Sequence, residues 1–529
     1  MPEHLSAFTR RDLLTLVGQI AGGAAMYQAM SSLGLAEESN YRGPIHLQGA
    51  PKRASVLILG AGIAGMVAAL ELRAAGYRVQ VLEYNPKAGG RCWTLRGGDE
   101  YTELGGFRQQ CQFAPGQYIN PGPWRIPYHH HAMLDYCRRL GVALEPFVQI
   151  NYNAYVHSSK AYGGKPQRFR HVQSDYQGHI AELFAKCVRG NQLDASLTHE
   201  DLERLLESLK NWGALDAGYR YLKSPPSSSH RGYDLDDGGG LAPPGELSQP
   251  LELAELLQSR LWTSIAAGQG YHMQPAIFQP VGGMDRIAQA FAREVGSLIR
   301  YNTRVFKIDQ DDKGVTVNYT NRRDGSGGVA KADWCICTLP VSILSQLELN
   351  VSAKMKTAID ALPYHASLKA GLQFKRRFWE DDERIYGGIT YTNLPITTIA
   401  YPNHGCNMGG KGVLLGAYMF AGNAFKYTAM DPAQRLQEIV AMGAQIHPQY
   451  TAEFENGITV GWHRVPWSNG CFGAWNSDRR AAYYEDMCQI DGRIVLAGEH
   501  VSRIPAWQEG AALSALDVCE RLHRRALSA

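Results

Sequence analysis

The clearest pattern of apolar positions lies shortly after residue 50. Residues 55–59 (SVLIL) form an uninterrupted apolar segment, which is typical of a strand buried on both faces. A glycine-rich segment, residues 60–65 (GAGIAG), follows at once, and apolar residues then continue to about Gly76, which predicts a tight turn and a helix. Residues 78–82 (RVQVL) predict a second strand. This order of elements predicts an α/β fold with a parallel sheet.

The glycine turn predicts a dinucleotide site. Gly60 permits the tight turn, Gly62 lets the backbone approach a pyrophosphate, and Gly65 lets the helix pack closely on the strand. Glu83 follows the second strand at the spacing at which a carboxylate holds ribose hydroxyl groups, and it disfavours a 2′-phosphate. We therefore expect a Rossmann-type domain whose dinucleotide contacts come from Gly60, Ala61, Gly62, Ile63, Ala64, Gly65 and Glu83.

Composition and charge narrow the class of protein. With 45% hydrophobic and 19% charged residues, the 529-residue chain has the composition of a large folded protein. The formal net charge of +3 is too small over this length to indicate nucleic acid as a partner. The ten cysteines are scattered, which excludes a disulfide scaffold, and no pair of CxxC motifs predicts a zinc site. Cys335 and Cys337 lie two apart in an apolar segment, so we expect them to pack on one strand face.

The first 50 residues contain a candidate export signal. Arg10-Arg11 is followed by Asp12 and an uncharged segment up to Ala36, and this arrangement resembles a twin-arginine signal. The segment is too weakly apolar to predict a membrane-spanning helix. An ordinary N-terminal helix capped by Thr9 explains the same residues equally well. The sequence therefore leaves both a cytoplasmic and an exported protein open.

Residues 83–106 carry a resemblance to a known family. Glu83 is followed by Gly89-Gly90-Arg91 and then by Glu103-Leu104-Gly105-Gly106. This arrangement resembles the opening of the flavin amine oxidases, which include monoamine, polyamine and L-amino acid oxidases. The resemblance implies bound FAD, with Gly90 and Arg91 against its diphosphate and with Gly105 and Gly106 near the isoalloxazine ring.

Later segments resemble the same family in the same order. The strand-like segment 304–308 resembles the strand whose backbone, at Val305, pairs with the adenine. Gly498-Glu499 resembles the turn at the ribityl and phosphate groups, and Gln508 lies in the helix that faces the flavin pyrimidine edge. The resemblance implies three interleaved parts: an FAD-binding domain (51–110, 275–345 and 465–529), a mixed-sheet substrate-binding domain (111–127 and 346–464) and an inserted helical domain (128–274).

An oxidase that acts on amino acids needs a cation for the substrate carboxylate, and arginine supplies two parallel donors. Trp124-Arg125-Ile126-Pro127 resembles the R-[LI]-P element of L-amino acid oxidases, in which the arginine holds that carboxylate. The family usually places this arginine directly after the ELG turn, whereas residues 107–123 intervene here. Arg108 therefore remains a rival, and we favour Arg125 because Ile-Pro and a helical segment follow it.

Three further segments complete the site that the resemblance implies. Lys369, upstream of Phe378-Trp379, resembles the family lysine that bonds a water beside flavin N5, where a cation would help O2 to accept electrons. Tyr401, directly before Pro402, resembles a tyrosine that gives the substrate carboxylate a second hydrogen bond. Ala506 and Trp507 resemble one wall of an aromatic cage around the substrate amine.

Two further features suggest chemistry that we do not expect here. The segment around Cys471 resembles the monoamine oxidase motif whose cysteine is bonded to the flavin, but L-amino acid oxidases hold FAD non-covalently, so we expect Cys471 to be unattached. His129-His130-His131 could suggest a metal site, but no second cluster of ligands accompanies it in the sequence. We therefore expect no metal.

The resemblance predicts an FAD-dependent L-amino acid oxidase. It would convert L-amino acids with hydrophobic or aromatic side chains and O2 into 2-oxo acids, ammonia and H2O2. The alternatives are the related monooxygenase that forms an amide, a monoamine oxidase, and an inactive flavin-binding partner or chaperone subunit. We expect no nucleic acid and no membrane span, and we expect a homodimer because dimers are common among such proteins.

Overall fold

A six-stranded sheet forms the centre of the nucleotide-binding part. The computed structural model describes residues 39–190 and 198–528, so the twin-arginine-like segment lies outside the described residues. Neighbouring strands are parallel except for the last pair. The two strands predicted at 55–59 and 78–82 are confirmed with those bounds. The order is β14 (Ile299–Arg300), β2 (Arg78–Leu82), β1 (Ser55–Leu59), β18 (Trp334–Cys337), β26 (Ile494–Leu496) and β25 (Ile490–Asp491).

Helices cover one face of this sheet, and a second sheet with short helices covers the other. The first face packs against α3 (Ile63–Ala74), α4 (His131–Arg139), α10 (Asp285–Val295) and α18 (Gln508–Leu527). Cys335 and Cys337 both point into the core on the second face, as predicted. That core is closed by β15 (Thr303–Gln310), β16 (Val315–Asn321), β17 (Gly327–Ala332), β19 (Glu348–Leu349), α11 (Val341–Leu344), α12 (Ala353–Ala361) and α17 (Ser477–Cys488).

A seven-stranded mixed sheet forms the second part of the molecule. Its strand β20, which pairs with β23 and with the edge strand β24, is buried along its whole length, and β9 and β21 form the parallel pair of the sheet. The order is β10 (Gln167–Arg168), β9 (Tyr155–His157), β21 (Ile389–Thr392), β22 (Thr398–Ala400), β23 (Gly412–Phe420), β20 (Ser367–Phe374) and β24 (Phe454–Gly461). One face packs against α13 (Phe378–Asp381), α14 (Ala421–Thr428), α15 (Pro432–Gly443) and α16 (Tyr450–Glu453). The other face holds a core that includes Trp124 and Tyr418.

Short sheets connect these parts. The strand β13 (Ile277–Pro280) pairs with both β7 (Ile126–Pro127) and β8 (Leu144–Pro146), so the chain directly after Arg125 is fixed by backbone hydrogen bonds. Three two-stranded ribbons complete the set. They are β3 (Leu95–Arg96) with β6 (Tyr118–Ile119), β4 (Glu100–Thr102) with β5 (Arg108–Gln110), and β11 (Tyr233–Leu235) with β12 (Glu246–Leu247).

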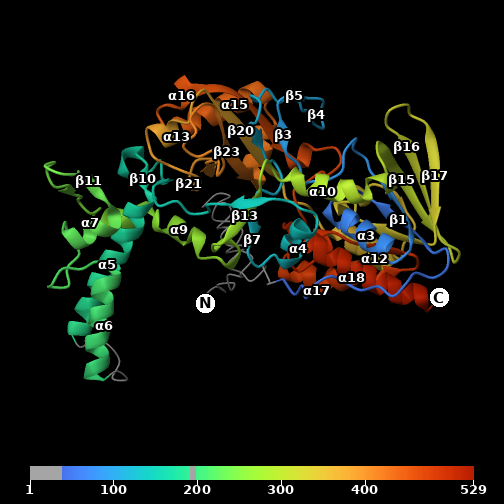
Figure 1. Cartoon of the computed structure of the whole chain (residues 1–529), viewed down its shortest axis with the longest axis horizontal. Coiled ribbons are helices and arrows are strands. Elements are labelled where there is room, and N and C mark those ends of the chain that lie inside the picture. Colours follow the sequence, from blue (N-terminus) through green and yellow to red (C-terminus); the bar gives the residue numbers. More distant parts are fainter. Residues whose placement is uncertain (1–38, 191–197, 529) are drawn as a thin grey trace, which may run out of the picture.

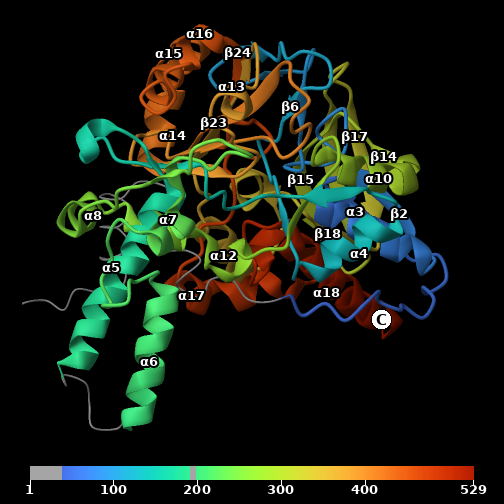
Figure 2. The same ribbon diagram turned by 60° about the vertical axis from the view of Figure 1, so that its left-hand side comes forward.

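A helical assembly stands at one end of the molecule, where α5 and α6 extend away from the sheets (Figures 1 and 2). It consists of α5 (Phe169–Arg189), α6 (His199–Trp212), α7 (Pro225–Arg231), α8 (Leu253–Ser259) and α9 (Trp262–Ile265). The assembly begins at Phe169 and not at residue 128 as expected. Residues 128–168 belong to other parts of the fold: α4 packs in the nucleotide-binding core, and β9 and β10 extend the seven-stranded sheet.

The mixed α/β architecture agrees with the fold class expected from the sequence: a Rossmann-type domain, a mixed-sheet part and a helical part that alternate along the chain. Within residues 39–190 and 198–528, no helix is both long enough and apolar enough to span a membrane.

Candidate active site

The glycine turn between β1 and α3 has the geometry of a phosphate-binding cradle. Gly60 has a φ of +98°, and a Cβ at Gly65 would lie 2.0 Å from the carbonyl oxygen of Gly60, so both positions require glycine. Gly62 caps α3, and a Cβ there would meet no protein atom within 4 Å. The open face above Gly62, at the N-terminus of α3, fits a pyrophosphate.

Glu83 lies at the end of β2, directly beside this turn. Its carboxylate accepts hydrogen bonds from the backbone amides of Ala61 and Asn85, both at 2.7 Å, and burial raises its pKa. The amide of Thr303, at the start of β15, donates to the Glu83 carbonyl. Val305 follows at the point where the register between β15 and β16 shifts. This arrangement fits the ribose and adenine of a dinucleotide.

Arg91 joins the second glycine segment to the C-terminal part of the chain. Gly89 forms a bridge with Gly62, so Gly90 and Arg91 lie against the first glycine turn. The Arg91 guanidinium donates to the carboxylate of Glu499 at 2.8 Å and to the carbonyl of Cys471 at 2.7 Å. Burial alone would raise the pKa of Glu499, but the charges of Arg91 and His500 and the hydrogen bonds from Arg91 and Ala506 together lower it. A partly buried ion pair therefore ties the second glycine segment to the C-terminal part of the chain.

Glu499 also positions the start of the last helix. Its second carboxylate oxygen accepts from the amide of Ala506 at 3.1 Å. The preceding Gly498 has a φ of +140°, a conformation that favours glycine. Gln508 then begins α18 next to Trp507. Four of the C-terminal positions proposed from the sequence, Gly498, Glu499, Ala506 and Gln508, therefore lie in one connected segment beside Arg91.

The glycine that contacts the Arg91 segment was missed by sequence reasoning. A Cβ at Gly122 would lie 1.9 Å from the carbonyl oxygen of Arg91, so the two backbones touch. Gly105 and Gly106 form the turn between β4 and β5, where Gly105 faces the Arg464 side chain. Residues 107–123 thus contain the two ribbon strands β5 and β6, and they end with Gly122 and Pro123 directly before Trp124 and Arg125. The Gly-Pro pair before Trp124 was the available signal.

Arg125 is buried in an aromatic environment. Its side chain is 2% exposed, and its guanidinium carbon lies 4.9 Å from the Trp124 ring, 5.6 Å from the Trp507 ring and 5.9 Å from the Phe147 ring. Arg108, the rival, lies on β5 with an exposed side chain that pairs with Glu100. The structure therefore brings Arg125, and not Arg108, to Trp507.

Lys369 projects from the centre of β20 toward the loop that carries Arg125. Its ammonium donates to the carbonyl of Gly122 at 2.6 Å and lies over the rings of Trp124 (4.7 Å) and Tyr418 (4.5 Å). Burial lowers its pKa to about 7, and the nearby charge of Arg125 contributes to the decrease. Tyr418 is a site residue that the sequence did not single out, because tyrosines in strands are common core residues.

The structure does not bring Tyr401 to this group, which corrects the expectation from the sequence. Its side chain lies on the opposite side of the seven-stranded sheet, in the core with Trp379. Its hydroxyl is within 2.7 Å of both Thr390 Oγ1 and His447 Nε2, and His447 in turn bonds Glu383. The preceding Ala400 faces the side that holds Trp124. Adjacent strand residues face opposite sides of a sheet, so Ala400 faces the site whereas its neighbour Tyr401 points away from it.

Cys471 lies near the same lysine. Its amide donates to the carbonyl of His365, and burial raises the pKa of its thiol, which the charge of Lys369 partly offsets. The absence of a bond between Cys471 and the cofactor stays a prediction.

Trp507 contacts two histidines. Its ring stacks on that of His272, with centroids 5.3 Å apart, and meets the ring of His130 edge-on at 4.9 Å. His272 comes from the turn η3 (Tyr271–Met273), far from His130 in sequence. No local motif marked His272, because only the tertiary fold brings it to this place.

A Rossmann-type cradle lies beside a mixed sheet that carries a buried lysine, an arrangement that fits a dinucleotide-dependent oxidoreductase. Residues 63–523 match the flavin containing amine oxidoreductase family, and the chain belongs to this family. It is therefore an FAD-dependent oxidoreductase, and the residues around Gly62, Glu83 and Arg91 fit that cofactor.

Named relatives share most of the chain. YobN of Bacillus subtilis (strain 168) is 28% identical over 484 residues, covering 89% of this chain and 94% of that protein. An L-amino-acid oxidase of Siganus canaliculatus is 26% identical over 486 residues, covering 89% and 86%.

Solved structures share the fold. Putrescine oxidase bound to putrescine matches with a TM-score of 0.58 at 17% identity, covering 89% of this chain and 99% of that chain. Cyclohexylamine oxidase from Brevibacterium oxydans matches with a TM-score of 0.59 at 16% identity, covering 90% and 100%.

Proposed function

We propose that this protein is an L-amino acid oxidase. The observation that carries the proposal is the buried guanidinium of Arg125, which lies between the rings of Trp124 and Trp507 and close enough to Lys369 to lower its pKa. A simple amine has no carboxylate for such a guanidinium, whereas an amino acid offers one that accepts two parallel hydrogen bonds. The relatives named L-amino-acid oxidase support the same proposal.

In the proposed reaction the amino acid loses a hydride from its α-carbon and a proton from its amine, giving an imino acid that water hydrolyses to a 2-oxo acid and ammonia. Bound FAD supplies the redox chemistry by taking up the electron pair that finally reduces O2 to H2O2. Arg125 holds the carboxylate and Trp507 covers the amine side, which orients the α-carbon. Protonated Lys369 provides a positive charge where negative charge develops on O2.

The surroundings of Arg125 favour substrates with apolar side chains. Trp124, Phe147, Tyr418 and Trp507 lie within contact distance of Arg125, Lys369 or one another, so much of the wall is aromatic. Burying an apolar side chain against aromatic rings is favourable, whereas a charged side chain loses its hydration there. We therefore expect phenylalanine, tyrosine, tryptophan and leucine to be better substrates than glutamate or lysine.

A panel of L-amino acids and matched amines tests the proposal. Peroxide, ammonia and a 2-oxo acid released in equal amounts from L-amino acids would support it. Formation of an amide with loss of CO2, activity on amines alone, or no bleaching of the flavin absorbance by any amino acid would contradict it.

A further inference from the structure

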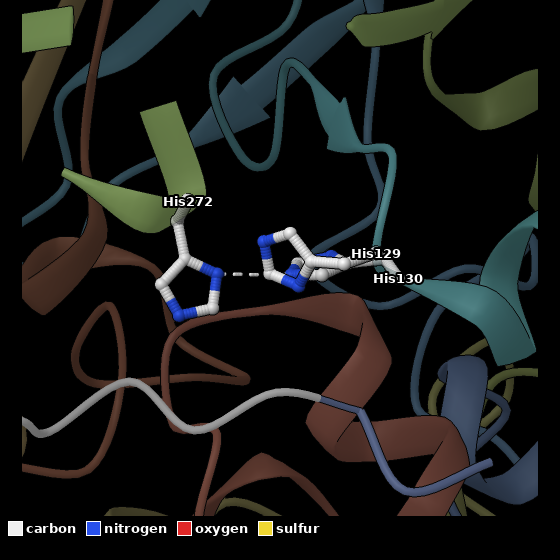
Figure 3. A group of neighbouring side chains, drawn as sticks. All are labelled: His129, His130 and His272. Carbon is white, nitrogen blue, oxygen red and sulfur yellow. Dashed lines mark hydrogen bonds between the residues drawn. The ribbon is translucent and has the colours of Figure 1, made fainter. Parts of the chain in front are cut away.

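Three histidines from two separate segments meet beside Trp507. His129 and His130 precede α4, and His272 lies in η3 (Figure 3). All three are buried, at 0%, 1% and 1% exposure, and one ring nitrogen from each lies within 4.8 Å of the others. His131, the third histidine of the run, is exposed and lies outside the group. The fold thus adds His272, a possible ligand from a distant segment, to the two histidines that are adjacent in the sequence.

The separation of two of these nitrogen atoms matches metal coordination. His130 Nε2 and His272 Nδ1 are 3.3 Å apart and share a hydrogen bond, which a bound ion would replace. Zinc binds histidine nitrogen at about 2.0–2.1 Å in tetrahedral sites, which places two ligand atoms about 3.3–3.4 Å apart. The His129 ring stacks on Tyr271 beside this pair and brings one of its nitrogens within 4.8 Å of the ring nitrogens of the other two.

The chemistry of the donors selects the kind of ion. Burial lowers the pKa of His130 and brings that of His272 to about 3, with neighbouring histidines and Arg125 adding to the effect. Neutral imidazoles keep a lone pair for a metal, and a set of nitrogen donors suits zinc and its neighbours, whereas calcium and magnesium need oxygen ligands. The charge of Arg125 opposes a cation, so the site would bind more weakly than a structural zinc site.

We propose that His129, His130 and His272 form a site for a late first-row divalent cation such as Zn²⁺, with three imidazole ligands and one open coordination position. An ion in this site would inhibit the enzyme, because His130 and His272 both contact Trp507, whose ring lies 5.6 Å from the Arg125 guanidinium. This second consequence rests on the proposed function, since the ion would then compete with the substrate amine.

Calorimetric titration of the flavin-loaded protein with Zn²⁺, without any amino acid, tests the site itself. We expect saturable binding of one ion per chain. Changing His129, His130 or His272 singly to Asn should weaken binding by about 10- to 100-fold, the loss seen even when only a partner of a metal ligand is removed. His131→Asn is the matched control and should bind like the unchanged protein. Flavin content after gel filtration reports whether each variant folds.

Two results would overturn the site. One is no saturable Zn²⁺ binding by the unchanged protein. The other is equal loss of binding in His131→Asn and His272→Asn, which would assign the ion to surface histidines. If a variant fails to retain flavin, titration of the unchanged protein with Co²⁺ decides instead: a strong visible band beyond the flavin absorption indicates tetrahedral nitrogen coordination, and only the weak bands of an octahedral ion would contradict the proposal.

Initial rates at fixed free Zn²⁺, held constant by a chelator because amino acids also bind zinc, test the inhibition. We expect the apparent KM to rise with free Zn²⁺ and this rise to be lost in any flavin-loaded variant that still turns over, with His131→Asn behaving like the unchanged protein. Zinc binding in a protein that oxidises no amino acid would disprove the proposed function and leave the site intact. A protein that oxidises amino acids at a rate independent of zinc, and that binds no zinc, would disprove the metal site and leave the proposed function intact.

Discussion

The ammonium of Lys369 donates a hydrogen bond of 2.6 Å to the carbonyl of Gly122. Gly122 in turn touches the backbone of Arg91, and Arg125 follows it in the same loop. One strand residue of the seven-stranded sheet is thus linked both to the glycine segment that carries Arg91 and to the candidate carboxylate anchor. Burial of Lys369 at this contact lowers its pKa to about 7, so its charge changes near neutral pH.

We expect reoxidation of the reduced enzyme by O2 to slow as the pH rises through about 7. Lys369 is protonated below this pH and neutral above it, and only the cation favours the negative charge that develops on O2. Lys369→Met should lower the rate constant for O2 by about 10²–10³-fold, the cost typical of removing one electrostatic contact to developing charge. Stopped-flow mixing of the reduced enzyme with O2 across pH 6–9 measures both effects, and an equally steep pH profile in Lys369→Met would contradict the assignment.

The same pKa has a consequence for stability. A lysine in the unfolded chain holds its proton to a pKa of about 10.4, so the unfolded chain binds more protons than the folded one between pH 7 and that value. The contribution of Lys369 to the free energy of unfolding therefore becomes more favourable as the pH rises across this window. Chemical denaturation at several pH values should show a shallower rise for Lys369→Met than for the unchanged protein.

Arg125→Ala should raise KM for L-amino acids by roughly 10- to 150-fold. Charged hydrogen bonds contribute about 1.5–3 kcal/mol, which corresponds to this range. Arg108→Ala is the matched control, because Arg108 is exposed and pairs with Glu100, so KM should stay near that of the unchanged enzyme. Steady-state peroxide release measures both variants. A larger effect in Arg108→Ala would move the carboxylate site to the β4–β5 ribbon.

Gly62→Ala should keep the fold but lose FAD. Gly62 has an ordinary φ of −75°, and a Cβ there meets no protein atom, so the added methyl group points only toward the space assigned to the pyrophosphate. Gly65→Ala differs, because its Cβ would lie 2.0 Å from the Gly60 carbonyl and should destabilise the protein itself. Flavin absorbance after gel filtration and thermal unfolding of both variants separate the effects. Full flavin retention by Gly62→Ala would contradict the assigned position.

FAD should leave the protein when it is denatured in acid. Cys471 is partly buried and the pKa of its thiol is raised, which disfavours the thiolate that attaches a flavin. Cys471→Ala should therefore retain the same flavin content as the unchanged protein. Acid precipitation followed by an absorbance spectrum of pellet and supernatant tests this, and a yellow pellet that turns colourless in Cys471→Ala would show a covalent bond.

Sequence patterns predicted the fold better than the site. The apolar run at 55–59, the glycine turn and the strand at 78–82 depend on local rules, and the structure agrees with them. Contacts between distant segments follow no local rule. His272 reaches His130 only through tertiary packing, and Gly122 touches the backbone of Arg91 only because the chain returns there after residues 107–121. The prediction that Tyr401 contacts the substrate is wrong for a different reason. Successive strand residues alternate between the two faces of a sheet, and a resemblance in a loop-rich segment does not define which face each residue takes.

Tyr401→Phe tests that last correction directly. The hydroxyl of Tyr401 connects Thr390 to His447, and His447 continues to Glu383, all in the buried core behind the seven-stranded sheet. Removing this hydroxyl leaves buried partners without their hydrogen bond, so we expect the free energy of unfolding to fall by about 1–3 kcal/mol. KM for L-amino acids should stay unchanged, because the ring does not face Arg125. Denaturant unfolding and steady-state kinetics on the same preparation separate the two roles, and a raised KM at unchanged stability would return Tyr401 to the substrate site.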